Sequence, residues 1–402
     1  MINTKDHNGH LRSSKYLTKK NQTAVIKFFN ALFGISQTFG YHKKPLHIQK
    51  LKAEARKITK LSDFGDELFI PALETMVNNF NKLYNTIDYT PLAYVAFKNN
   101  IMKRLTNRLL IQKEINDFPD ILDEKIEKPL FVVSFARTGT TFMQNLLSLD
   151  PRSRPLKYWE ASDPVTPRDA YDNPNHKIIK KAENDLKILY KLIPELKSMH
   201  LIEADGPAEG IGLLMNSFYS KGFNASIILD EYNNWLEKQE MIYTYEFYKK
   251  QLQILQHRKS GTHWMLKCPA HLENVDALLA VFPDARIIQT HRDPNEFLGS
   301  LCSMSYYGYC NNYRYFNSNN YGASIMKESI SALEKSIDAF KNINNDQIIN
   351  IQYNELIKNP LETIRTIYNH FGYEFTAEYE TIIGNFLAQD RKKRSSLKKH
   401  SY

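Results

Sequence analysis

A polar turn between an apolar strand and an apolar helix is the part of this sequence best suited to hold an anion. Residues 130 to 133 (LFVV) are typical of a buried strand, and residues 142 to 149 repeat apolar side chains at helical spacing. Between them lies the turn of residues 137 to 141 (RTGTT). Backbone N–H groups and the helix dipole favour a negative charge at such a turn.

The side chains of this turn add to that preference. Gly139 allows the backbone to approach a ligand closely, and Thr140 and Thr141 place hydroxyl donors at the helix start. Arg137 offers a charge-assisted contact to an anionic oxygen. A nucleotide hydrolase of the usual kind has GxxxxGK[ST] here, whereas this chain has no lysine after the glycine. The alternative is an arginine-bearing turn that binds nothing.

A second candidate anion contact lies in the segment THRDPNEFLGSLCSM. Arg292 stands at the end of an expected strand, and Ser300 follows eight residues later in the next expected helix. With Asp293 and Pro294 fixing the turn between them, the two side chains can hold one phosphate from two sides. The alternative is a surface arginine and a packed serine.

The elements around these residues alternate between strands and helices. Strands are expected within residues 263–269, 285–294 and 347–356, with helices between them, and this alternation is typical of a parallel sheet covered by helices. We therefore expect an α/β fold of the P-loop type, a three-layer sandwich with about five strands. From residue 23 to about 115 the pattern is helical, and residues 61–69 (LSDFGDELF) are expected to start a helix, with polar caps ahead of apolar residues. A helix over residues 360–371 is expected to follow the last strand.

The expected organisation of the 402-residue chain has four parts: residues 1–22 as a flexible basic N-terminus, 23–125 as a helical region packed on the core, 126–390 as the α/β domain and 391–402 as a basic tail. A composition of 42% hydrophobic and 24% charged residues is that of a globular protein. Of the net charge of +9, six positive charges lie in residues 391–399 (RKKRSSLKK). The surplus elsewhere suits an anionic ligand and does not require nucleic acid.

Cysteine content and hydropathy bear on the location of the protein. Cys268, Cys302 and Cys310 cannot form a disulfide framework, and we expect free thiols in a reducing, cytoplasmic compartment. No Cys/His spacing suggests a metal site. Residues 24–39 (AVIKFFNALFGISQTF) are too short and too interrupted for a membrane span, which favours an amphipathic surface or core helix over a signal anchor.

Together the two anion elements resemble those of the sulfotransferases that use 3′-phosphoadenosine 5′-phosphosulfate. In that family a P-[RK]-[ST]-G-T-[TS] loop holds the 5′-phosphosulfate, and residues 135–141 (FARTGTT) are similar to it, with Ala136 where proline is common. An R-(x)7-S element holds the 3′-phosphate, and Arg292 and Ser300 match it. Further segments, among them WMLKCPAHLENVDALLAVFPDARIIQTHRDP, resemble a bacterial branch of the family, over roughly residues 53–402.

The resemblance implies a sulfotransferase that moves a sulfuryl group to a hydroxyl, or less favourably an amine, by in-line transfer without a metal. It implies these donor-binding residues: Arg137, Thr138, Gly139, Thr140, Thr141, Phe142, Arg292, Ser300 and Tyr353. Tyr353 can equally be a packing residue. The tail resembles a basic loop over the 3′-phosphate only loosely, and because the chain ends at Tyr402, closure of the nucleotide site from that side is an open question.

The reaction needs a base, for which Glu160 is the first candidate and His271 the second. Glu160 stands at the expected end of a strand, on the side of the sheet where ligands bind. Lys267 resembles a family lysine that supports the transition state. The alternatives are a structural carboxylate for Glu160, an ordinary helix histidine for His271 and a surface lysine for Lys267.

An acidic loop is the candidate contact to the acceptor. Glu203, Asp205 and Glu209 lie in the segment HLIEADGPAEG, where they can contact substrate or, for Glu209, favour a helix N-terminus. The acceptor itself, whether small molecule, lipid or carbohydrate, and the oligomeric state are not specified by the sequence. Alternative functions are a catalytically inactive nucleotide-binding relative, a nucleotide kinase and, least favoured, a nucleic-acid binder using the basic tail.

Overall fold

The structure, a computed structural model, describes residues 22–38, 44–86, 89–225, 227–309, 311–313, 318–341 and 343–396. Apart from Gln22, the expected flexible N-terminus lies outside these residues, as do Cys310 and residues 397–402 of the expected basic tail. Residues 391–396 of that tail continue a helix.

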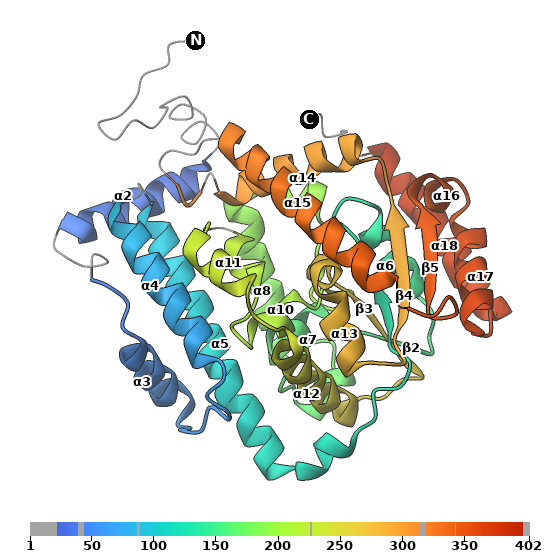
Figure 1. Ribbon diagram of the computed structural model, residues 1–402, viewed down its shortest axis with the longest axis horizontal. Helices are drawn as coiled ribbons and strands as arrows, with labels where there is room; N and C mark the ends of the chain where they lie inside the picture. The colour runs from blue at the N-terminus through green and yellow to red at the C-terminus, as the bar shows by residue number, and fades with distance from the viewer. Residues whose placement is uncertain are drawn as a thin grey trace, which may run out of the picture.

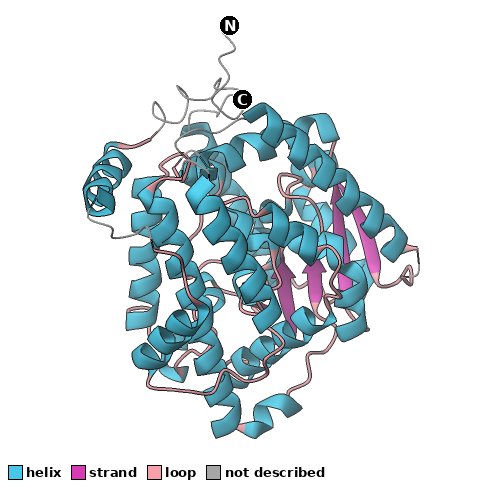
Figure 2. Ribbon diagram, turned by 60° about the vertical axis from the view of Figure 1, so that its left-hand side comes forward, coloured by secondary structure: helices cyan, strands magenta, loops and turns pink. Residues whose placement is uncertain are grey.

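A five-stranded sheet stands at the centre of the described chain, in the order β2-β3-β1-β4-β5. Every pairing is parallel. The strands are β1 (Leu130–Val132), β2 (Ser153–Pro155), β3 (His263–Lys267), β4 (Arg286–His291) and β5 (Ile348–Gln352). Figure 2 shows the strands enclosed by helices. The prediction of an α/β fold with a central parallel sheet of about five strands is confirmed.

Alternate residues of the central strands face two separate helical layers. On one face Leu130, Val132 and Ile288 form a buried cluster with the helices α6, α16, α17 and α18. On the other face Phe131 and Leu266 pack against α10, α12 and α13. The helices of the two layers are α6 (Thr140–Leu147), α10 (Ile211–Met215), α12 (Ile242–Arg258), α13 (Val275–Val281), α16 (Tyr353–Lys358), α17 (Pro360–Phe371) and α18 (Ala377–Ser396).

A second hydrophobic core joins the N-terminal helices to an insertion between β2 and β3. Its buried residues come from α3, α4 and α5, and from the segment around α11. Figure 1 shows these helices beside the sheet. The helices of this part are α2 (Ala24–Thr38), α3 (Ile48–Thr59), α4 (Ile70–Thr86), α5 (Pro91–Asp117) and α11 (Asp230–Leu236), with the 3₁₀ turns η2 (Pro119–Asp123) and η4 (Lys221–Ala225).

The remaining helices surround the carboxyl ends of the strands or flank the sheet. They are α7 (Tyr158–Ser162), α8 (Lys177–Leu192), α9 (Leu196–Met199), α14 (Pro294–Tyr309) and α15 (Ser318–Phe340), with the 3₁₀ turns η3 (Arg168–Tyr171) and η5 (Pro269–Asn274). None of the helices in the described ranges is long and apolar enough to cross a membrane.

Two local predictions differ from the structure. Residues 61–69 were expected to start a helix, but α4 begins only at Ile70. The carboxylates of Asp63 and Asp66 accept hydrogen bonds from the backbone N–H groups of Gly65 and Leu68, and Gly65 has a φ of +80°, so this segment turns. The strand expected to run to residue 356 ends at Gln352, and Tyr353 is the first residue of α16.

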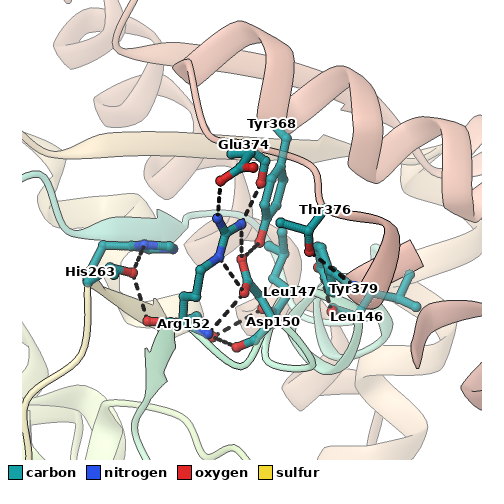
Figure 3. Close-up of polar contacts among 11 residues, drawn as sticks. Leu146, Leu147, Asp150, Arg152, His263, Tyr368, Glu374, Thr376 and Tyr379 are labelled. Carbon is teal, nitrogen blue, oxygen red and sulfur yellow. Dashed lines mark hydrogen bonds and ion pairs between the residues drawn. The ribbon is translucent and has the colours of Figure 1, made fainter. Parts of the chain in front are cut away.

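A network around Asp150 ties α17 to the sheet (Figure 3). The side chain of Asp150 is 1% exposed and accepts hydrogen bonds from Arg152 Nε at 3.1 Å and from the Tyr368 hydroxyl at 2.8 Å. Burial raises the pKa of Asp150, but the bonds from Arg152 and Tyr368 hold that pKa below its ordinary value overall. Arg152 also pairs with the exposed Glu374.

Replacing Asp150 with asparagine is expected to lower the free energy of unfolding by about 2 kcal/mol at neutral pH, because Arg152 loses its buried partner charge. The Asp150 carboxylate stabilises the folded protein fully at a pH above its pKa in the unfolded chain. This stabilisation is lost as the pH falls through the lower pKa of the folded state. The free energies of unfolding of wild type and variant should therefore converge below pH 3.8. Urea unfolding across the pH range measures this. The control is Glu374→Gln, at the other partner of Arg152, whose side chain is 78% exposed; it should change the free energy of unfolding little. An equal effect of the two substitutions would contradict the role of Asp150 as the buried partner of Arg152.

Candidate active site

The turn after β1 has a backbone that few residues other than glycine can adopt. Arg137 has a φ of +73° and Gly139 a φ of +91°, and α6 begins directly afterwards at Thr140. A Cβ atom on Gly139 would lie 3.0 Å from Cδ2 of Tyr353, a contact that real Cβ atoms rarely make. Glycine therefore serves two needs here, the left-handed backbone and the close approach of the tyrosine ring.

Arg137 brings the two expected anion elements together. Its Nε donates to Ser300 Oγ at 2.8 Å, and its Nη1 donates to the backbone oxygen of Met199 at 2.8 Å. Ser300 lies on α14 and Met199 ends α9, so one guanidinium joins three segments that are distant in sequence.

Arg292 holds the same turn from the other side. Its Nη1 donates to the backbone oxygen of Arg137 at 2.9 Å, and its guanidinium lies 4.3 Å from the centre of the Tyr353 ring. Its Nε pairs with Glu296 one helical turn on, at 2.9 Å. The predicted pair Arg292 and Ser300 thus lies beside the predicted loop.

A cavity of about 250 Å³ opens between these groups and α18. The residues lining it that matter for an anionic ligand are Arg137, Gly139, Thr140, Thr141, Phe142, Arg292 and Tyr353, and from α18 Phe386 and Asp390. Helix α18 thus borders this cavity. Sequence reasoning did not identify Phe386 or Asp390, whose helix showed no motif.

Thr138 is turned into the protein and away from this cavity. Its hydroxyl donates to the backbone oxygen of Phe135 at 2.7 Å and shares a hydrogen bond of 2.7 Å with the Thr290 hydroxyl. With 1% of its surface exposed, its side chain fixes the turn to β4.

A charged group lies beside the turn, at the carboxyl end of β3. Lys267 is the register partner of Val132 in β1, which places its ammonium next to the start of α6. Lys267 Nζ lies 2.5 Å from Glu209 Oε1 and 3.5 Å from Thr141 Oγ1. His200 Nε2 lies 4.0 Å from the same Glu209 oxygen. Lys267, Glu209, His200 and Arg137 therefore form one cluster over the strand ends.

The charges of this cluster follow from burial and pairing. Burial alone would raise the pKa of Glu209, but the Lys267 ammonium and His200 lower it below its ordinary value. Burial lowers the pKa of His200, Glu209 opposes this, and the positive charges of Lys267 and Arg137 add to the lowering. Glu209 is therefore ionised near pH 7 and His200 is neutral, able to accept a proton.

The prediction of Glu160 as the first candidate for the base needs correction. It is 0% exposed, and its two oxygens accept four hydrogen bonds. Arg154 donates two of them, at 3.0 and 2.5 Å, the Tyr171 hydroxyl donates one at 2.6 Å, and the backbone N–H of Lys157 donates one at 2.9 Å. A carboxylate so enclosed has no oxygen to offer a substrate, and it holds the start of α7 in place.

His271, the second candidate, is also enclosed. It is 0% exposed, its Nδ1 lies 2.9 Å from the Tyr245 hydroxyl, and its ring packs edge-on against Phe131 at 5.2 Å. Burial lowers the pKa of His271 to about 3. It is a neutral core histidine and does not reach the cavity.

Of the acidic loop only Glu209 reaches the cluster. Asp205 accepts hydrogen bonds from Lys157 Nζ at 2.7 Å and Trp159 Nε1 at 2.9 Å, and Glu203 is exposed. His200 was missed, although it stands at the start of the same loop, nine residues before Glu209. The proximity of His200 to Glu209 arises only when the loop folds over β3, and no local sequence pattern indicates it.

Comparison with known proteins decides the family. A family model described as "Sulfotransferase family" matches residues 129–377. The chain belongs to the sulfotransferase family. The matched range contains both expected anion elements and the Lys267 cluster, and the resemblance noted from the sequence is confirmed at this level.

Two crystal structures of bacterial sulfotransferases are similar over most of this sulfotransferase. STF1 from Mycobacterium tuberculosis H37Rv is 27% identical, with 85% of this chain and 93% of that chain covered at a TM-score of 0.75. STF9 from Mycobacterium avium is 28% identical, with 85% and 88% covered at a TM-score of 0.77. No curated protein matches the chain.

Because Glu160 and Glu209 lie in different environments, we expect their replacement to lower the stability of the protein by different amounts. Glu160→Gln removes the buried charge opposite Arg154, which is expected to lower the free energy of unfolding by about 3 kcal/mol. Glu209, in the Lys267 cluster, has 26% of its side chain exposed. Glu209→Gln is therefore expected to lower the free energy of unfolding by less, about 1 kcal/mol. Urea unfolding of both variants measures the difference. A Glu160→Gln protein as stable as wild type would contradict the structural assignment of Glu160.

Proposed function

We propose that this protein transfers a sulfuryl group from 3′-phosphoadenosine 5′-phosphosulfate to a hydroxyl group of an acceptor. The observation that carries the proposal is a cavity lined by Arg137 and Arg292, with Ser300 bound to Arg137 behind it and the Lys267 cluster beside it, in a chain of the sulfotransferase family. A donor with two separate anionic ends needs two cationic groups, and the two guanidinium groups that line the cavity, of Arg137 and Arg292, support this proposal.

The residues of the cavity fit such a donor. The turn of residues 137–141 offers N–H groups at the start of α6 and the Arg137 charge for the 5′-phosphosulfate. Arg292 and Ser300 offer a guanidinium and a hydroxyl for the 3′-phosphate. The glycine at position 139, where a Cβ would meet Tyr353, allows the ligand to approach the backbone. The donor supplies the activated sulfuryl group, and its transfer releases 3′,5′-adenosine bisphosphate.

The residues of the Lys267 cluster supply the remaining functions. Lys267 and Arg137 place positive charge where negative charge develops on the departing oxygen, in a partly buried site that strengthens the effect. His200, neutral and 22% exposed on its side chain, takes the proton of the acceptor hydroxyl at its ring nitrogen. Glu209, ionised beside it, stabilises the imidazolium that forms.

We favour His200 over Glu209 as the base because Glu209 is paired with Lys267. The Glu209 oxygen nearest His200 is already bound to Lys267 at 2.5 Å, so its proton affinity is low. An amine acceptor is a less favoured variant of the same reaction. The free thiols of Cys268 and Cys302 fit a cytoplasmic location.

Binding of the reaction product tests the donor site directly. Calorimetry with 3′,5′-adenosine bisphosphate is expected to show micromolar binding to the wild type. Arg137→Ala and Arg292→Ala should each weaken it by roughly tenfold to a hundredfold, the loss of a charge-assisted hydrogen bond. ATP serves as the comparison ligand, and tight binding of ATP with none of the bisphosphate would instead support a nucleotide kinase.

Replacement of His200 tests the assignment of the base. With an acceptor found by screening, His200→Ala is expected to lower kcat by about 10²- to 10⁴-fold while bisphosphate binding stays unchanged. In the wild type the acidic limb of kcat/KM should lie below pH 6.5, because the folded pKa of His200 is below that ordinary value. Full activity of His200→Ala would rule this histidine out.

A further inference from the structure

Helix α2 exposes a row of large apolar side chains that no described part of the protein covers. The exposed fractions of its members range from 37% to 65%. The members of this row, which we call the α2 apolar face, are Val25, Phe28, Phe29, Leu32 and Ile35. An isolated exposed apolar side chain is ordinary, but five on one short helix indicate a binding surface.

The α2 apolar face is distinct from the side of the helix that packs on the protein. At 100° per residue its five members fall within an arc of roughly 120°. Ile26, which is 0% exposed, and Asn30 lie on the adjoining arc. Asn30 Oδ1 accepts a hydrogen bond from the backbone N–H of Leu92 at 3.4 Å, at the start of α5. Helix α2 thus packs against the protein through the side that carries Ile26 and Asn30, and it exposes the α2 apolar face.

Hydrogen bonds connect α2 to the edge of the protein that carries the active site. Beyond Leu92, the cap residue Thr90 bonds to the backbone of Asn311 and Asn312, each at 2.9 Å. These residues follow α14, the helix of Ser300. In Figure 1, α2 lies at the upper left, toward the end of the molecule to which the strand arrows point.

Positive charge is concentrated on the helix that packs against α2 and in the sequence that precedes it. The sequence ahead of α2, residues 1–23, holds five lysines and arginines against one aspartate. Helix α8, which packs against α2, holds five lysines against one glutamate and one aspartate. Lys27, on another side of α2, is also exposed. An apolar face next to a lysine-rich helix is complementary to a surface that is apolar within and negatively charged at its boundary.

An anionic lipid surface has this character. A helix of 15 residues is too short to span a bilayer, but it is long enough to lie in the headgroup region with its apolar face buried. A second copy of the chain is a poorer partner, because two such faces are small against the roughly 1,600 Å² buried in a standard protein interface and the adjoining lysines would repel each other.

We propose that α2 is an interfacial anchor that binds the protein to anionic lipid surfaces through Phe28, Phe29, Leu32 and Ile35, with adjoining lysines facing the headgroups. The anchor holds the edge of the sheet that carries the active site toward the lipid. This inference does not depend on the donor or the reaction, since lipid binding is measured without either.

Vesicle sedimentation of the full-length protein tests the proposal. The protein is expected to sediment with vesicles of phosphatidylglycerol and phosphatidylcholine in equal amounts, and much less with phosphatidylcholine alone. The double change Phe28→Asp with Leu32→Asp should lower the partition coefficient at least about tenfold. Raised salt should weaken binding of the wild type.

A matched control exists on α15, where Ile330 and Ile337 are 52% and 49% exposed. The double change of these two to aspartate adds the same charge to apolar positions of similar exposure and should leave vesicle binding unchanged. Circular dichroism melting confirms that both variants fold. The proposal fails if the wild type stays in the supernatant, if both variants lose binding equally, or if light scattering shows a dimer that the α2 change dissociates without vesicle binding.

Discussion

The guanidinium of Arg137 is the interaction on which the arrangement of the site depends. It ties the turn after β1 to α14 through Ser300 and to α9 through the backbone of Met199. The turn can present this side chain because Arg137 and Gly139 both adopt positive φ values. The strained backbone is held in place by Arg292, which bonds to the backbone oxygen of Arg137, and by the ring of Tyr353. One residue therefore joins the turn after β1, α14 and α9 beside the Lys267 cluster.

The parallel sheet explains why residues so far apart in sequence meet. Because β1, β3 and β4 are neighbours and run in the same direction, their carboxyl ends lie at one edge. That edge receives the turn from β1, Lys267 from β3 and Arg292 from the loop after β4. The positive charge gathered there is balanced in part by Glu209, which pairs with Lys267 and leaves His200 as the neutral group.

The sequence predicted the features that local pattern determines. Residues 130–133, with the turn that follows, and α17 at Pro360–Phe371 were recognisable because alternation, glycine placement and helical spacing act over a few residues. The bounds of helix α15 were not predicted, although Met326, Ile330, Leu333 and Ile337 recur at helical spacing. Glu160 shows the limit of position along the chain. It was expected at the end of a strand but lies in α7, five residues after β2 ends, and its partners Arg154 and Tyr171 are determined by packing.

A crystal structure of the protein with 3′,5′-adenosine bisphosphate tests the account most directly. The account predicts the 5′-phosphate at the N–H groups of the turn of residues 137–141 and beside Arg137. It predicts the 3′-phosphate within hydrogen-bond distance of Arg292 and Ser300, and Lys267 and His200 facing the side of the 5′-phosphate where an acceptor would stand. A bisphosphate bound elsewhere, or bound in this cavity with Arg292 and Ser300 turned away from its 3′-phosphate, would contradict it.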